Sequence, residues 1–91
     1  MSGQYEIVLR FALPPRDVSR FGRVTEFEEK LSRNSELYEL DGHDCSAGCM
    51  SIRLFTNDPS GSYEAIRGII PDGCCDAGYR PRGSEANLTS L

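Results

Sequence analysis

Four cysteines and a single histidine are the residues of this chain whose types could support chemistry. Cys45 and Cys49 are separated by three residues, and Cys74 and Cys75 are adjacent. Zinc prefers four such soft ligands, arranged as a tetrahedron around the ion. The four thiols therefore form a candidate zinc site, although adjacent cysteines diverge and rarely hold one metal together.

The histidine offers a second use of the same segment. His43 lies two residues before Cys45, so both side chains share one side if the segment is a strand. A cysteine nucleophile needs a base within hydrogen-bond reach and a group that orients the base. Asp41 or Asp44 would serve as that group, which leaves a thiol-based site open as an alternative. The simplest competing interpretation is that the cysteines are small buried or exposed thiols without a special role.

Four segments of the chain have strand patterns, and they decide where these residues lie. Residues 5–13 alternate apolar and more polar positions with a period of two. Residues 36–44 and 50–56 show the same alternation, and a hairpin loop in which Gly48 takes a positive φ is expected between them. Residues 77–82 are predicted to form a fourth, weaker strand.

Two segments have helical patterns. Residues 17–34 carry apolar side chains three or four positions apart, and a capping-box motif at Thr25 predicts that the regular helix begins only there. A second helix is predicted with Asp58 as its N-cap and Pro59 at its first position. Residues 71–73 should end it, because they contain proline and glycine.

The predicted order of elements is β-α-β-β-α-β, which is the order of a ferredoxin-like α+β sandwich. We expect four antiparallel strands in the order 4-1-3-2, with two helices on one face of the sheet. Residues 1–82 are predicted to form this single domain. Residues 83–91 are polar and are expected to be a flexible C-terminal tail.

Three short motifs, spread over most of the chain, are Asp41-Gly42-His43-Asp44, Arg53-Leu54-Phe55-Thr56-Asn57-Asp58-Pro59 and Gly78-Tyr79-Arg80-Pro81. Together they resemble the corresponding segments of small uncharacterised bacterial proteins with a ferredoxin-like fold. The resemblance implies this fold and no particular chemistry. Ligand-sensing, RNA-binding and partner-binding modules all use the fold, so the fold alone does not decide between them.

Charge and hydropathy exclude several classes of function. Ten basic against 14 acidic residues give a net charge of −4, which argues against a nucleic-acid or anionic-membrane partner. No apolar run of about 18 residues is present, so no membrane-spanning helix is expected. The first residues lack the pattern of a signal peptide, which favours the cytoplasm and reduced cysteines. No nucleotide-binding, zinc-protease or serine-hydrolase motif occurs, and we expect a protein that is not an enzyme.

The face of the predicted sheet opposite the core is the strongest candidate for function. It carries apolar and arginine side chains that are expected to form an interface, namely Val8, Arg10, Leu37, Arg53, Phe55 and Arg80. We predict a module that binds a protein partner, or a second copy as a homodimer, because exposed apolar patches mark interfaces. The apolar residues would be its anchors, and the arginines would set orientation through carboxylate pairing.

Three alternatives to this interface remain. Glu6 and Glu39 could pair with the arginines across the strands and leave only a solvated face. Phe55 with the arginines has the chemistry of an RNA-binding sheet, but the aromatic, glycine-rich motif of such sheets is absent. The loop of residues 14–17, with Arg20 and Arg23 nearby, lies where a small-molecule sensing domain would hold its ligand.

Overall fold

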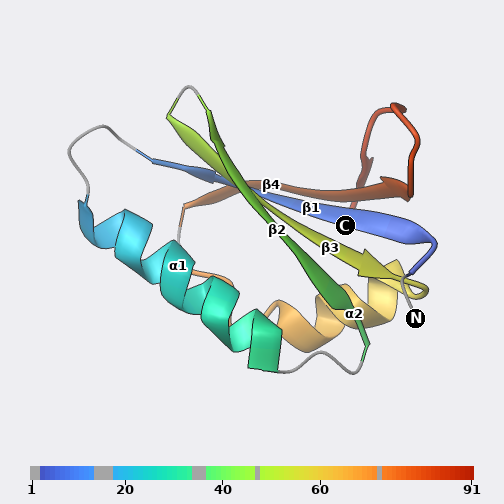
Figure 1. Ribbon diagram of the computed structural model, residues 1–91, viewed down its shortest axis with the longest axis horizontal. Coiled ribbons are helices and arrows are strands. Elements are labelled where there is room, and N and C mark those ends of the chain that lie inside the picture. Colours follow the sequence, from blue (N-terminus) through green and yellow to red (C-terminus); the bar gives the residue numbers. More distant parts are fainter. Residues whose placement is uncertain (1–2, 14–17, 34–36, 47, 72) are drawn as a thin grey trace.

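Five strands and two helices make up the structure, a computed structural model that describes residues 3–13, 18–33, 37–46, 48–71 and 73–91 (Figure 1). In chain order the elements are β1 (Tyr5–Ala12), α1 (Val18–Arg33), β2 (Glu39–Ser46), β3 (Cys49–Thr56), α2 (Pro59–Ile66), β4 (Cys74–Pro81) and β5 (Thr89–Ser90). The chain is therefore a small α+β protein, as its sequence patterns predict.

The strands form one antiparallel sheet in the order β2-β3-β1-β4-β5. β1 lies in the middle and pairs with β3 on one side and with β4 on the other. Both helices lie on the same side of this sheet (Figure 1). The sheet differs from the predicted four-stranded one because a fifth strand follows β4. That strand lies within residues 83–91, the segment expected to be a flexible tail.

The core lies between the sheet and the helices and follows the predicted alternation. Every second residue of the two central strands is fully buried there: Ile7, Leu9 and Phe11 in β1, and Met50, Ile52 and Leu54 in β3. Helix α1 contributes Val24, Phe27 and Leu31, and the Phe27 ring meets the Phe11 ring edge to face with centroids 5.9 Å apart. Apolar side chains at every second strand position thus pack against apolar side chains three or four positions apart in the helix, and together they form one apolar layer.

The helices correct two predicted boundaries. α1 is regular from Val18 onward, and the Thr25 hydroxyl donates to the Phe21 carbonyl inside the helix instead of capping its start. α2 begins as predicted, because the carboxylate of Asp58 accepts the backbone N–H of Gly61 at 3.0 Å. It ends earlier than predicted, at Ile66. Within the described residues, neither helix is long and apolar enough to cross a membrane.

One end of the sheet is held together by the last residue of β1 and by the residue that follows it. The backbone N–H of Ala12 donates to the carbonyl of Gly73, which precedes β4. The N–H of Leu13 donates to the carbonyl of Gly48 at 2.7 Å, in the hairpin between β2 and β3. Gly48 has the predicted positive φ, at 76°. These bonds bring the segments that contain the four cysteines to the same end of the sheet.

Candidate functional site

The strand registers arrange the outer face of the sheet, the face away from the helices, in rows across the strands. One row contains, from β2 to β4, Glu39, Phe55, Glu6 and Arg80. Phe55 lies opposite both glutamates in this register, and residues opposite one another on a face are within contact distance. We call this set the Phe55 row. It places one aromatic ring between two carboxylates.

The Phe55 ring is covered by an arginine of the same chain. The guanidinium carbon of Arg82 lies 3.9 Å from the ring centroid. Arg82 directly follows β4, and its backbone N–H donates to the carbonyl of Gln4 at 2.8 Å, which fixes its position. The face of an aromatic ring is electron-rich and attracts a cation. The Phe55 ring therefore already receives one arginine side chain within the molecule.

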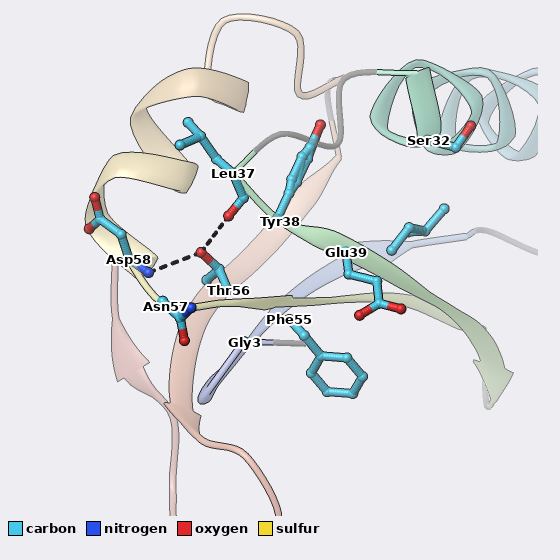
Figure 2. A pocket seen from close by; sticks show the side chains of 10 residues that line it. Gly3, Ser32, Leu37, Tyr38, Glu39, Phe55, Thr56, Asn57 and Asp58 are labelled. Atoms are coloured by element: carbon cyan, nitrogen blue, oxygen red, sulfur yellow. Dashed lines mark hydrogen bonds between the residues drawn. The ribbon is translucent and has the colours of Figure 1, made fainter. Parts of the chain in front are cut away.

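The two carboxylates of the Phe55 row differ in their partners. Glu6 is largely buried and lies 3.6 Å from the guanidinium of Arg80, which also donates to the carbonyl of Ala86. Glu39 is exposed and has no ion-pair partner among the residues that the structure describes. Figure 2 shows the Glu39 carboxylate beside the Phe55 ring. Among the described residues, Glu39 is therefore the carboxylate at this ring that has no ion pair.

A bulge in β2 surrounds the next arginine with acids. The register of β2 against β3 shifts between Leu40 and Gly42, and Gly42 adopts a φ of 143°, which side-chain-bearing residues rarely adopt. The extra residue, Asp41, lies 3.5 Å from the guanidinium of Arg53, and Asp44 lies 3.2 Å from it. Arg53 is therefore paired with carboxylates of its own face.

The third predicted arginine is paired as well. Arg10 lies 3.3 Å from the carboxylate of Asp76 on β4, and both side chains are nearly half exposed. Exposed pairs of this kind contribute little to stability because water screens them. The three arginines expected to orient a partner thus meet carboxylates of their own chain. This arrangement supports the cross-strand alternative for these arginines, with Glu6 in its expected role.

The structure separates the two aliphatic members of the predicted interface from Phe55. Val8 lies on the outer face but is 4% exposed, and its neighbour on β4 is Gly78. Leu88 packs over Gly78, so the segment after β4 covers this part of the face. Val8 is therefore buried by the chain itself and offers no exposed contact to a partner.

Leu37 does not belong to any strand of the sheet. It precedes β2, and its carbonyl accepts the Thr56 hydroxyl at 2.8 Å. Figure 2 shows its side chain directed toward α2, whereas the Phe55 ring points away from β3 in the other direction. Leu37 is 54% exposed and, with Ile69, borders a hollow of about 250 Å³ beside α2. Of the three predicted apolar anchors, only Phe55 remains at the surface of the outer face.

A larger hollow of about 690 Å³ lies where β2 begins and runs beside the Phe55 row. Its lining includes Glu39, Phe55, Asn57 and Asp58 and is drawn in Figure 2. The volume falls within the range of roughly 300–1,000 Å³ that is usual for small-ligand pockets. The Glu39 carboxylate and the aromatic ring therefore border a space large enough for a long side chain and part of its backbone.

The cysteines share one end of the sheet but do not form a cluster. Cys45 lies opposite Met50, Cys49 opposite Ala12, and Cys74 opposite Phe11. Successive strand residues point to opposite faces, so this register directs Cys45 and Cys74 to the helix side and Cys49 to the outer side. Among the described residues, no group of three or more histidine, cysteine and acidic side chains could hold a metal ion.

The thiol chemistry of the site is also unfavourable for a nucleophile. Cys74 is half-buried against the core, and this burial raises the pKa of its thiol, so that the neutral form is favoured. His43 shares a face with Cys45, as the strand pattern predicts. Its imidazole Nδ1 lies 2.6 Å from the Glu28 carboxylate of α1, so the aspartates expected to orient it are not its partners. The interaction joins α1 to β2.

The proline-rich loop of residues 14–17, where a sensing domain would hold its ligand, lies outside the described residues. The residue that sequence reasoning missed is Arg82. It continues the even-numbered side of β4 two positions beyond Arg80, and that spacing was the available signal. Comparison with known protein families, with curated proteins and with solved structures found no match to this chain.

Proposed function

We propose that this chain is a small protein-interaction module that binds an arginine side chain of a partner protein at the Phe55 row. The observation that carries the proposal is the contact between Arg82 and Phe55. This contact supports the proposal that the Phe55 ring accepts a guanidinium group on its face. The partner's arginine takes the place of Arg82 and pairs with Glu39, whose carboxylate lies beside the ring.

Arginine fits this site better than lysine does. A guanidinium is planar, stacks on aromatic rings and still presents N–H groups to a carboxylate in its plane. An ammonium is compact and strongly hydrated, and it gains less from stacking. The net charge of −4 also favours a basic partner, because opposite charges speed encounter and exclude acidic competitors.

The hollow beside the Phe55 row gives the partner room for the rest of its contact. It extends from Phe55 and Glu39 along the start of β2, so a segment next to the bound arginine enters it. Arginine and aromatic residues are enriched among the side chains that dominate protein interfaces. The proposed function is binding, because the observation that supports it is a non-covalent contact between a guanidinium and the Phe55 ring.

The experiment is a titration of the protein with two synthetic peptides, followed by changes in backbone amide NMR signals. One peptide carries a single arginine between glycine and leucine residues, and the other carries lysine in its place. We expect the arginine peptide to shift the signals of Phe55 and Glu39 and the lysine peptide to bind several-fold more weakly. Arg82→Ala should strengthen binding, because it removes the internal competitor. Phe55→Ala and Glu39→Gln should weaken it.

The matched control is Arg67→Ala on the surface after α2. Arg67 pairs with Glu64 and lies away from the Phe55 row, so its loss should leave peptide binding unchanged. Equal binding of both peptides, or full binding by a folded Phe55→Ala variant, would contradict the proposal. Circular dichroism of each variant separates a lost contact from a lost fold.

We further infer that the arrangement of β1 to β4 with the two helices is ferredoxin-like. The element order and the central place of β1 support this, and β5 is then an addition to the edge. The four free cysteines support a reducing compartment such as the cytoplasm.

A further inference from the structure

The edge of β4 is occupied by the last residues of the same chain. β5 pairs antiparallel with β4, with Ser90 opposite Gly78 and Thr89 opposite Tyr79. The backbone N–H of Leu91 then donates to the carbonyl of Ala77 at 3.1 Å. This is the pattern in which an extended peptide adds one strand to a sheet edge, where backbone bonds hold it and side-chain pockets select it.

Gly78 has no side chain and therefore leaves a space in β4 that this segment occupies. We call this space the notch. A Cβ atom built on Gly78 would lie 2.7 Å from the Leu88 Cβ and 2.9 Å from the Thr89 carbonyl oxygen. A Cβ atom essentially never comes this close to a heavy atom to which it is not bonded, so any larger residue at position 78 must displace the segment. The notch accepts Leu88 on the outer side of the sheet.

The second anchor lies on the opposite side of the sheet. Leu91 packs against the core cluster on the helix side, beside hollows that Tyr63 and Arg67 line. Leu88 and Leu91, which are three positions apart in the sequence, thus pack against β4 on opposite faces of the sheet. The residues between them hold the segment by backbone bonds, so the segment has the features of a short, separately bound peptide.

A tight turn connects this segment to β4. The N–H of Ser84 donates to the carbonyl of Pro81 at 3.1 Å, and Gly83 adopts a φ of 81° in the turn. Only glycine adopts that conformation without strain. If the turn opens, residues 84–91 extend away from their own sheet and leave the edge of β4 uncovered.

We propose that the edge of β4 is a docking groove that residues 84–91 of a second copy of this chain fill by reciprocal exchange. The occupant is a second copy of this chain, because the segment that fits the notch is the chain's own and every copy carries it. Exchange preserves each contact of the closed form, so that only the turn and the protein concentration decide between the two forms. This surface adjoins the Phe55 row, because Arg80 of that row donates to the Ala86 carbonyl of the segment. The inference nevertheless does not require that the row binds a partner's arginine.

The decisive experiment mixes two variants that each lack one half of the contact. Leu88→Asp has an intact edge, but its own segment cannot enter the notch. Gly78→Val has an intact segment, but its own notch is filled. We expect each variant alone to be monomeric by native mass spectrometry. An equimolar mixture should give a heterodimer held by one exchanged contact, in which the Gly78→Val segment occupies the Leu88→Asp edge. Gly78→Ala replaces Gly78→Val if the larger side chain prevents folding.

A turn variant gives an independent test. Gly83→Pro cannot keep a φ of 81°, so it penalises the closed turn and leaves the exchanged form unstrained. We expect at least a tenfold lower dimer dissociation constant than for the unchanged chain. Adding Gly78→Val to Gly83→Pro should return the protein to a monomer.

Controls distinguish the failure of each part. A labelled peptide of residues 84–91 should bind the folded Leu88→Asp variant, and no binding would overturn the groove itself. Peptide binding without a heterodimer in the mixture would overturn exchange between copies. Glu39→Gln in both partners should leave the heterodimer unchanged, because Glu39 lies on β2 at the opposite edge of the sheet, so a failure here does not depend on the arginine site.

Discussion

The hydroxyls of Thr56 and Ser62 lie 2.7 Å apart in the interior and hold three chain segments together. Thr56 donates to the carbonyl of Leu37 at 2.8 Å, and its oxygen accepts the backbone N–H of Asp58 at 3.0 Å. The Ser62 hydroxyl donates to the same Leu37 carbonyl at 3.2 Å. This pair therefore fixes the start of α2 to the segment that leads into β2, next to the hollow drawn in Figure 2.

Thr56→Val should destabilise the protein by about 2 kcal/mol, because the buried Ser62 hydroxyl, the Leu37 carbonyl and the Asp58 N–H each lose one partner. Urea denaturation followed by circular dichroism measures the loss. Thr56→Ser keeps the hydroxyl and should lose clearly less. Ser60→Ala, at an exposed position of α2, is the matched control and should change stability negligibly. Equal losses for Thr56→Val and Thr56→Ser would assign the effect to the methyl group instead.

The N-cap of α2 gives a second prediction. Asp58→Ala should cost about 1 kcal/mol, because the Gly61 N–H loses the carboxylate that accepts it. Asp58→Asn retains an accepting oxygen and should recover most of the stability. The same denaturation assay decides, and an alanine variant as stable as the unchanged protein would show that the cap contributes nothing.

The two adjacent cysteines should react at different rates. Cys75 is exposed, whereas burial raises the pKa of Cys74 and disfavours its thiolate. Iodoacetamide followed by mass spectrometry should therefore modify Cys75 first at neutral pH in the folded protein. Unfolding in urea should make the two rates similar. A faster reaction at Cys74 in the folded state would contradict its burial.

The same raised pKa has a consequence for stability. Below the ordinary thiol range, Cys74 is neutral in both the folded and the unfolded chain, so it contributes no pH dependence there. As pH rises through that range, the unfolded thiol ionises first, and the folded state loses stability until its own thiol ionises. Cys74→Ser should flatten this alkaline decline in urea midpoints. Cys75→Ser should reduce it only in part, because burial raises the pKa of Cys74 more than the nearby Cys75 thiolate does.

The link between α1 and β2 gives the last prediction. The Glu28 carboxylate is mostly buried and contacts His43, which is partly exposed. Glu28→Gln should weaken protection of the α1 amides against hydrogen exchange and lower stability by less than about 1 kcal/mol. Glu29→Gln is the control, because Glu29 is exposed on the same helix. Identical exchange in both variants would mean that the contact does not restrain α1.

Most of the fold was predictable because its signals are local. The alternation of Ile7, Leu9 and Phe11 identifies a strand and its buried face, and Asp58-Pro59 marks a helix start. The strand at Thr89–Ser90 was not predictable, because two leucines in a polar stretch have no period. The burial of Leu88 depends on the glycine notch at position 78, which is remote in sequence.

The candidate site was predicted only in part, for a similar reason. Strand alternation correctly places Phe55, Arg10 and Arg53 on the outer face. It does not show that Val8 is covered by a later segment or that Leu37 precedes the strand it was expected to join. The contact of Arg82 with Phe55 depends on how the chain turns after β4, and no local pattern encodes that turn.

The central position of β1 also governs how this protein reaches its native state. β1 is the first strand made, yet both of its neighbours, β3 and β4, come from much later in the chain. Long chain segments must close before its apolar residues are covered, and such distant pairings slow folding to milliseconds or longer. During synthesis β1 therefore emerges before both of its neighbours, and its backbone edges stay unpaired until β3 and β4 follow.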